Sequence, residues 1–280
     1  LQRELKDSDV IIHLAGITDV AYTQTESNTE QDNRIKKVGI EGTRNIIKLS
    51  PASCKIIFPS THVVYEGLKD TRLDILETEP PRPVLTYAKG KVQSEKDLAA
   101  SNKNYVILRL GSVYGYSLDT TRMNIMPNLF SKIASQEGTI SLYSGGVQIK
   151  SLVPLLDVAR CLKFMAEKDD ICRETFHCSK ENMTVKEVAQ LCHQFSPRLT
   201  LLETEDEVPN LGYTLSNKKL LSTGFEFLHN IEDSIKEMVD NWSARKTEKP
   251  LEHIIKGSDH YTDDRGEIAN YELPEAINLV

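Results

Sequence analysis

The stretch that decides the fold is Lys55–Thr61, with the sequence Lys-Ile-Ile-Phe-Pro-Ser-Thr. A run of apolar residues that ends in hydroxyl side chains is typical of a strand buried in a parallel sheet. Further along, the segment Tyr87–Lys91 opens a proline-free run that predicts a helix. Helical spacing places Tyr87 and Lys91 on one face, as a catalytic phenol and its ammonium partner require. The resulting hypothesis is redox chemistry at a sugar-like alcohol.

The energetics allow Tyr87 to act as a base. A phenol with a solution pKa near 10 must lose roughly 3 pKa units to be useful at neutral pH, which is about 4 kcal/mol of stabilisation. An ammonium group ~4 Å away, at an effective dielectric constant of about 20, supplies about that much. Thr61, at the end of the strand, can hold the same substrate hydroxyl through a hydrogen bond.

The Tyr-x-x-x-Lys spacing also occurs at Tyr65 and Lys69, so the spacing alone is not specific. That second pair contains Gly67 and directly follows the strand, which predicts a loop setting. Taken in isolation, Tyr87 and Lys91 would more often mark an ordinary exposed helix face. The surrounding elements have to support the catalytic interpretation.

Composition and charge exclude several classes of protein. The chain has 280 residues, of which 39% are hydrophobic, enough for one large or two small domains with a core. Its net charge of -7 and the lack of a basic cluster argue against a nucleic-acid partner. Without a membrane-length apolar run or a signal peptide, a cytoplasmic protein with no membrane partner is expected. The cysteines and histidines are scattered without ligand spacing, so reduced thiols and no metal site are expected.

Strands and helices alternate through the first part of the chain. The expected segments are a strand at 9–16, a helix at 31–49 and a further strand at 105–110. This alternation predicts a Rossmann-like α/β fold, a doubly wound parallel sheet with helices on both faces. Ligands bind beyond the carboxyl ends of the strands in such sheets. Gly16, Thr61 and Ser112 fall at those ends, so we expect them to border one site.

Downstream the elements become shorter. The expected helices are 124–135, 156–167, 184–195 and 231–242, and the expected strands are 139–143 and 174–178. They predict a smaller C-terminal substrate lobe over the edge of the sheet. The core would comprise mainly 1–115 and 150–180, the lobe mainly 116–149 and 181–242, and a polar linker 243–258.

With these motifs together, residues 1–242 resemble the extended short-chain dehydrogenases/reductases of the NAD-dependent nucleotide-sugar epimerase/dehydratase family. The individual motifs are short, but their order and spacing are specific in combination. They are His13–Gly16, Glu41–Asn45, Ser60–Thr61 with Val64–Tyr65, Tyr87 with Lys91, Arg109–Gly115 and Asp157–Ala159. The resemblance implies an enzyme of polysaccharide biosynthesis that oxidises a sugar hydroxyl, lets the keto intermediate reorient and reduces it again.

The resemblance also implies a role for each matching residue. Tyr87 would be the catalytic base, Lys91 its partner and a ligand of the nicotinamide ribose, and Thr61 the hydroxyl of the triad. The cofactor, NAD or NADP, would be contacted by Leu14, Ala15, Gly16, Ser60, Tyr87 and Lys91. The substrate, a nucleotide-diphosphate sugar, would be contacted by Thr61, Ser112, Asn124, Tyr143 and Lys150. The family also implies a homodimer, paired through the helices near Lys37 and Lys91.

Several positions depart from the family pattern. Lys150 replaces the arginine that usually grips the diphosphate, which keeps the charge but loses the two-pronged fork. Gly39 and Ser112 replace asparagines near the cofactor and the substrate. His62 and Val63 stand where water-eliminating members carry Asp-Glu, because elimination needs extra acid and base groups. A dehydratase is therefore disfavoured, which leaves an epimerase or a one-way NADPH-dependent nucleotide-sugar reductase.

The family's opening Gly-x-x-Gly-x-x-Gly turn, whose helix holds the dinucleotide diphosphate, is not found in this sequence. The nearest pattern, Gly39 and Gly42, falls inside a predicted helix, where we expect the glycines to allow close helix packing. The first βα unit of the sheet is therefore expected to be missing, as in a fragment that binds NAD weakly and leaves turnover to an intact parent. A non-catalytic binding module of this fold stays open as an alternative.

The segment after the linker predicts a turn that enters a strand. Asp264, Arg265 and Gly266 resemble the opening of a sugar-modifying cupin, so 259–280 is expected to begin such a domain. The histidine cluster that a cupin would use is not found in this sequence, and a plain surface turn is an equal alternative.

Overall fold

A computed structural model describes residues 5–17, 29–117, 121–206, 211–244, 257–263 and 266–271. Its central element is a four-stranded sheet with the spatial order β1-β2-β4-β8, in which every pairing is parallel. The strands are β1 (Val10–Ile12), β2 (Lys55–Thr61), β4 (Asn104–Leu110) and β8 (Glu174–Cys178). Every residue of β2 is buried, which explains its continuous apolar sequence. The predicted Rossmann-like α/β fold is confirmed.

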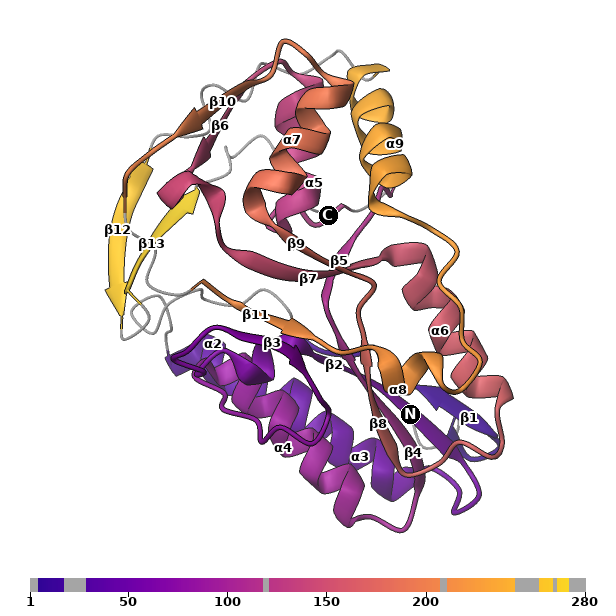
Figure 1. Ribbon diagram of the computed structural model, residues 1–280. Helices are drawn as coiled ribbons and strands as arrows, with labels where there is room; N and C mark the ends of the chain where they lie inside the picture. The colour runs from indigo at the N-terminus through magenta and orange to yellow at the C-terminus, as the bar shows by residue number, and fades with distance from the viewer. Residues whose placement is uncertain are drawn as a thin grey trace.

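Helices cover both faces of this sheet (Figure 1). One face carries α3 (Gly42–Leu49) and α4 (Thr86–Ala100), and the other carries α6 (Leu155–Glu167) and the short α8 (Lys218–Leu221). Ile56 and Phe58 of β2 belong to the hydrophobic cluster that contains Leu98 of α4. Ile57 belongs to the cluster that contains Met165 of α6. Neighbouring residues of β2 therefore serve opposite faces, as the alternation of side chains along a strand requires.

The predicted helix at 31–49 is helical throughout but has an irregular centre. It consists of α2 (Thr29–Lys36), a π-helical segment (Lys37–Glu41) and α3. The expected packing role of Gly39 and Gly42 is wrong, because a Cβ atom added at either position would meet no atom within 4 Å. Gly39 lies in the π-helical segment, a type of irregularity that is frequent at functional sites.

A separate hydrophobic cluster joins three helices above the sheet (Figure 1). The helices are α5 (Met126–Ser135), α7 (Val185–Phe195) and α9 (Ile231–Ala244). Thr184 and Glu187 form the predicted capping box at the start of α7. Buried residues of this cluster, such as Phe130 and Trp242, come from the segments expected for the substrate lobe. The division into domains stays a prediction.

Short strands connect this helical cluster to the sheet. β5 (Ser112–Tyr114), β7 (Ile149–Pro154) and β9 (Glu181–Thr184) form one small sheet, β6 (Thr139–Leu142) pairs with β10 (Thr200–Glu203), and β3 (Arg72–Ile75) pairs with β11 (Tyr213–Leu215). Most of them were not predicted, because a strand of three or four residues carries too few residues to show a period.

Two backbones touch where β7 runs parallel to the segment before β11, at a bridge between Ile149 and Gly212. The backbone N–H of Ile149 donates to the carbonyl oxygen of Leu211 at 2.7 Å. The next residue, Gly212, has a φ of +90°, and a Cβ atom there would lie 2.3 Å from the carbonyl oxygen of Ile149. Only glycine fits at this contact, because both the backbone angle and the available space exclude a side chain.

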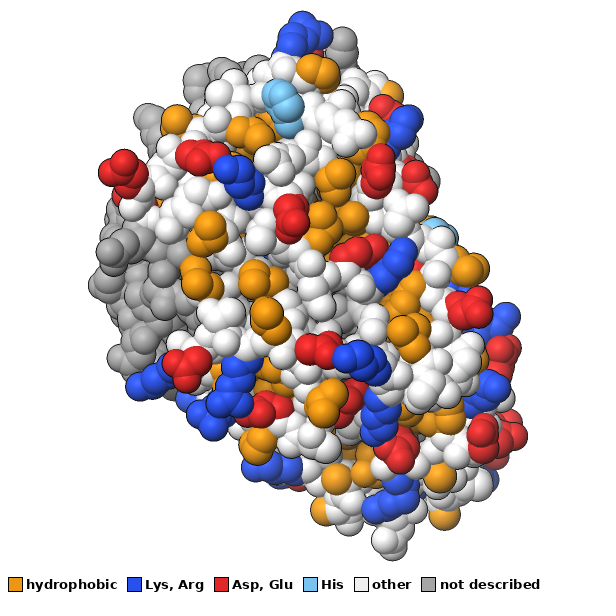
Figure 2. Space-filling view, in the orientation of Figure 1, with side chains coloured by type: hydrophobic (Ala, Val, Ile, Leu, Met, Phe, Trp, Pro, Cys, Tyr) orange, Lys and Arg blue, Asp and Glu red, His pale blue; other side chains and the backbone are white. Residues whose placement is uncertain are grey.

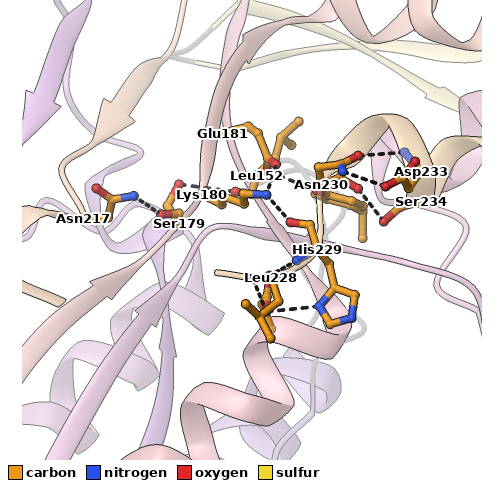
Figure 3. A network of polar contacts seen from close by, with 12 residues as sticks. Leu152, Ser179, Lys180, Glu181, Asn217, Leu228, His229, Asn230, Asp233 and Ser234 are labelled. Carbon is orange, nitrogen blue, oxygen red and sulfur yellow. Dashed lines mark hydrogen bonds and ion pairs between the residues drawn. The ribbon is translucent and has the colours of Figure 1, made fainter. Parts of the chain in front are cut away.

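A polar network holds the segment that leads into α9 (Figure 3). The Lys180 ammonium donates to the carbonyl oxygen of His229, and the His229 ring lies 3.1 Å from a carboxylate oxygen of the buried Asp157. Asn230 caps α9 by accepting the backbone N–H of Asp233 at 2.8 Å. The lobe helix α9 is thereby tied to α6 and to the segment after β8.

The tail contains an antiparallel hairpin of β12 (Gly257–Asp263) and β13 (Gly266–Tyr271). Gly266 begins the strand that the sequence predicts after the turn. Asp264 and Arg265 lie outside the described residues, and the cupin resemblance stays a prediction.

The features expected from composition can also be located. Cys54, Cys161, Cys178 and Cys192 are buried free thiols, and Cys172 is an exposed one. Across the residues that the structure describes, no helix has both the length and the apolar character that a membrane crossing needs.

Candidate active site

A cleft opens beyond the carboxyl end of β1, between the π-helical segment and the first turns of α4. Its lining includes Ala15 and Gly16 after β1, Gly39 of the π-helical segment, Phe58 of β2, and Tyr87 and Lys91 of α4. Leu14, a further predicted cofactor contact, precedes them with a side chain that is 66% exposed. The structure thus brings the small residues after β1 together with the tyrosine and lysine pair.

Tyr87 stands half-buried in the first turn of α4. The side chain of Thr61 lies near its hydroxyl, and the Thr61 oxygen accepts the backbone N–H of Val63 at 3.2 Å. Burial raises the pKa of Tyr87, while the positive charge of Arg122 and the nearby Thr61 side chain act in the opposite direction. The phenol therefore keeps its proton in this structure. The favourable charge that the spacing assigns to Lys91 comes from Arg122.

Lys91 lies one turn further along α4, on the same side as Tyr87. Its Nζ donates to the carbonyl oxygen of Pro59 at 2.8 Å and lies 4.6 Å from the centre of the Phe58 ring. The distance from Nζ to the centre of the Tyr87 ring is 5.9 Å. Burial lowers the pKa of Lys91 to about 8, against the raising effect of Glu95. An ammonium has three donors, and in the described part of the chain Pro59 occupies one of them.

Glu95 and Arg109 form an ion pair behind the cleft. Arg109 of β4 donates to Glu95 of α4 from Nη2 at 2.7 Å and from Nε at 3.1 Å. Ser60, a predicted cofactor contact, donates its hydroxyl to the same carboxylate at 2.6 Å. The Ser60 side chain therefore contacts the Glu95 carboxylate and is not among the residues that line the cleft. Glu95 was not predicted, although its position four residues after Lys91 on the same helix was a usable signal.

Three predicted substrate residues lie on segments beyond the edge of the sheet. Ser112 begins β5, Lys150 lies in β7, and the half-buried Tyr143 begins a short 3-10 helix (Tyr143–Gly146). Ser112 Oγ lies 3.2 Å from Nε2 of His62, the residue after Thr61. Burial lowers the pKa of Lys150, whose ammonium has no ion pair or hydrogen bond with any residue that the structure describes. Their substrate contacts stay predictions.

Asn124, the remaining predicted substrate residue, is exposed and accepts a hydrogen bond from Arg122 Nε at 2.7 Å. One turn later the buried Asn128 donates to the carbonyl oxygen of Arg122 at 3.0 Å and accepts the backbone N–H of Gly115 at 3.0 Å. Both asparagines therefore hold Arg122, whose charge acts on Tyr87. Asn128 was not predicted, because its partners are two backbone groups, which no side-chain pattern indicates.

The second Tyr-x-x-x-Lys pair lies away from the cleft. Tyr65 ends a 3-10 helix (His62–Tyr65), and Lys69 lies in the expected loop. The fully buried Tyr65 hydroxyl lies between Arg109 Nη1 and His177 Nε2, the latter at 2.8 Å. Burial raises the pKa of Tyr65 to about 12, which suits a structural phenol.

The fold and the cleft define a class of Rossmann-like proteins that carry a tyrosine, a lysine and a hydroxyl residue at the carboxyl edge of a parallel sheet. Residues 1–177 match the sequence profile of the NAD dependent epimerase/dehydratase family. Because this match covers more than half of the chain, the protein belongs to that family, and the resemblance drawn from its motifs is confirmed.

Individual relatives are distant. The chain is 23% identical to a dihydroflavonol 4-reductase of Callistephus chinensis, over 95% of this chain and 78% of that protein. Its structure is similar to RMD from Pseudomonas aeruginosa complexed with NADPH, with a TM-score of 0.73 and 17% identity over 88% of this chain and 86% of that one. It is also similar to UDP-glucuronic acid 4-epimerase from Bacillus cereus in complex with UDP-glucuronic acid and NAD, with a TM-score of 0.72 and 19% identity over 87% and 78%. These structural likenesses confirm the fold.

Proposed function

We propose that this protein is an NAD(P)-dependent nucleotide-sugar epimerase. The observation that carries the proposal is that Tyr87 and Lys91 line the cleft that Ala15 and Gly16 border, with the Thr61 side chain acting on the Tyr87 hydroxyl. A hydroxyl, a phenol and an ammonium at one sheet edge can move a proton on and off an alcohol. The family's NAD dependence supplies the matching redox partner.

The residues of the cleft fit a nicotinamide nucleotide. Gly16, Gly39 and Gly90 keep parts of its wall free of side chains, and a Cβ atom at Gly16 or Gly39 would project into open space. The Lys91 ammonium offers hydrogen-bond donors of the kind that ribose hydroxyls accept. When bound, the nicotinamide supplies the hydride acceptor for the oxidation and the hydride donor for the reduction.

Tyr87 and Thr61 would handle the proton of the reacting hydroxyl. In its ionised form Tyr87 accepts that proton from the hydroxyl oxygen as a hydride leaves the carbon that bears the hydroxyl for the nicotinamide. The product is a keto sugar. Thr61 holds the oxygen by a hydrogen bond throughout. After the keto sugar has rotated in the site, a hydride returns to the opposite face of the carbonyl carbon, and Tyr87 returns the proton to the oxygen. The charge of Arg122 favours the ionised phenol that this cycle needs.

Lys150 supports a nucleotide diphosphate as the substrate class. A half-buried cation without a partner among the described residues is costly, so an arriving anion stabilises it. The Lys150 charge also acts on His62, the residue after Thr61, which supports a role at this end of β2. We therefore expect the diphosphate at Lys150 and the sugar between Ser112 and Tyr87.

Replacing Tyr87 by phenylalanine tests the proposal. Tyr87→Phe should lower kcat by about a thousandfold, because general base catalysis contributes factors of that order, while calorimetry should show UDP-glucose binding nearly unchanged. Tyr105→Phe is the matched control, since it removes the same atom on β4, where the ring packs against Arg173. Residual turnover within about tenfold of the parent would overturn the assignment of Tyr87.

A one-way nucleotide-sugar reductase is the second candidate. It is favoured by the similarity to a dihydroflavonol 4-reductase along 95% of this chain. A reductase consumes NADPH with every turnover, whereas an epimerase regenerates its cofactor. Absorbance at the nicotinamide band during turnover separates the two: a steady signal supports the epimerase, and a continuous fall supports the reductase.

A further inference from the structure

His62 contacts side chains from two other segments of the chain. Its Nδ1 lies 3.1 Å from the hydroxyl oxygen of Tyr213, at the start of β11, and its Nε2 lies 3.2 Å from Oγ of Ser112, at the start of β5. The Tyr213 hydroxyl also donates to the carbonyl oxygen of His62 at 2.8 Å. All three residues are half-buried. Three elements thus meet in one short chain of hydrogen bonds directly after Thr61.

The geometry fixes the direction of each of these hydrogen bonds. A phenol has one hydrogen, and Tyr213 gives it to the backbone carbonyl of His62. Nδ1 of His62 must therefore carry a hydrogen and donate it to Tyr213. In a neutral imidazole the other nitrogen is then an acceptor, so Nε2 receives the hydroxyl hydrogen of Ser112. The Ser112 oxygen is left with lone pairs only.

The surroundings keep the His62 ring neutral. Burial lowers the pKa of His62 to about 3, and the positive charge of Lys150 acts in the same direction. A charged ring would donate from both nitrogens and would turn the Ser112 hydroxyl round. With a neutral ring, the Ser112 hydroxyl keeps donating its hydrogen to Nε2, because the Tyr213 hydroxyl holds the ring hydrogen on Nδ1.

Ser112 is close to the proposed site of chemistry. Leu110, two residues earlier, pairs in register with Thr61 across β4 and β2. The Thr61 side chain acts on the pKa of the Tyr87 hydroxyl and is therefore its neighbour. A sugar whose reacting hydroxyl lies between Thr61 and Tyr87 would therefore present a neighbouring ring position to Ser112.

We propose that His62, acting through Ser112, makes this protein select nucleotide sugars that carry a free hydroxyl beside the reacting carbon. The inference rests on the proposed function and names its specificity. A hydroxyl hydrogen satisfies the Ser112 oxygen, whereas a fluorine, a keto oxygen or a hydrogen at that ring position does not. His62 is a positioning residue, since it orients Ser112 and does not touch the sugar itself.

The ring nitrogens of His62 provide a test that needs no activity. Histidine ring nitrogen chemical shifts at neutral pH should show a neutral ring with its hydrogen on Nδ1, assigned by the signal that disappears in His62→Asn. Tyr213→Phe removes the hydroxyl that fixes this tautomer, and the Nδ1 preference should weaken. A charged ring, or a hydrogen on Nε2 in the native protein, would overturn the inference.

Ligand selectivity provides the second test. UDP-glucose and analogues with one ring hydroxyl replaced by fluorine are titrated into the NAD-saturated protein by calorimetry. At least one analogue should bind about tenfold more weakly than UDP-glucose, the upper range for one neutral hydrogen bond. In His62→Asn this ratio should fall toward one, because the asparagine amide can keep the donor to Tyr213 but is too short to place an acceptor at the position of Nε2, which Ser112 needs.

The variants separate the possible failures. His193→Asn is the matched control, because His193 lies on α7 with Nδ1 at 2.9 Å from the carbonyl oxygen of Leu199; its selectivity should equal that of the native protein. Equal selectivity in His62→Asn and native protein, at normal UDP-glucose affinity, overturns the inference alone. No UDP-glucose binding to the native protein overturns the proposed function and the inference with it.

Discussion

Glu95 and Arg109 form a two-point ion pair in which the side chains are only 8% and 7% exposed. The pair joins α4, which carries Tyr87 and Lys91, to β4 at the edge where ligands of this fold bind. Ser60 of β2 adds a third hydrogen bond to the same carboxylate. The two catalytic candidates on the helix are thereby held against the two central strands.

Glu95→Gln should destabilise the fold by about 3 kcal/mol, because it leaves the Arg109 charge buried without its partner. Chemical denaturation at neutral pH measures the change. Glu167→Gln is the control, since Glu167 pairs with Lys163 on the exposed face of α6; its effect should stay within about 0.5 kcal/mol. Equal effects of the two substitutions would contradict the structural role of Glu95.

Lys91→Met should change the pH dependence of stability. The pKa of Lys91 falls from its ordinary 10.5 to about 8 in the folded protein. Between these values the unfolded chain binds more protons than the folded one, so the native protein gains stability as the pH rises, by at most about 3 kcal/mol. Below pH 8 both states are protonated, and the cost of burying the charge is fully present.

The measurement for Lys91 is the difference in unfolding free energy between native and Lys91→Met proteins. Denaturation at several pH values from neutral to alkaline gives this difference, in which the titrations of other groups cancel. The native protein should gain on the variant as the pH rises above 8. A constant difference over that range would show that the Lys91 ammonium is solvated.

Lys150→Met should weaken the binding of UDP by about 10- to 100-fold, since hydrogen bonds to charged groups contribute about 1.5–3 kcal/mol. Lys150→Arg should retain or improve the affinity, because it restores the charge with a two-pronged donor. Calorimetry with UDP measures both. Lys163→Met, which removes an exposed lysine of α6, serves as the control. Unchanged UDP affinity in Lys150→Met would exclude the diphosphate role.

Gly39→Leu should weaken NADH binding by about tenfold, because forcing a side chain into space that a ligand fills costs about 1–3 kcal/mol. Gly42→Leu is a matched control: a Cβ atom at either glycine meets no atom within 4 Å, but only Gly39 is among the residues that line the cleft. Fluorescence titration with NADH compares the two. Equal affinities would place the cofactor elsewhere.

The elements that the sequence predicts well have a local cause. β2 and β4 are continuous apolar runs, and α4 lacks proline, so each can be recognised from its own residues. The π-helical segment around Gly39 could not be predicted, because no local pattern distinguishes it from an ordinary helix. The nearly continuous helical pattern at 31–49 hides it.

The site could be predicted only in part. Tyr87 and Lys91 share a short spacing on one helix, which sequence reveals. A charge that lowers the pKa of Tyr87 comes from Arg122 on a distant loop, which no spacing along the helix indicates. His62 owes its orientation to Tyr213, 151 positions further along the chain. Such partners are chosen by tertiary packing, which no local pattern contains.

The close backbone contact between Gly212 and Ile149 links the packing of β7 to the position of Lys150, and so to the substrate choice that the proposed function implies. A side chain at Gly212 would push β7 outward, and Lys150, the neighbour of Ile149, would move with it. Under the proposed function, the preference for one nucleotide sugar would therefore change in descendants of this protein through a residue that contacts neither ligand. Laboratory selections that randomise only the walls of the cleft would overlook this route.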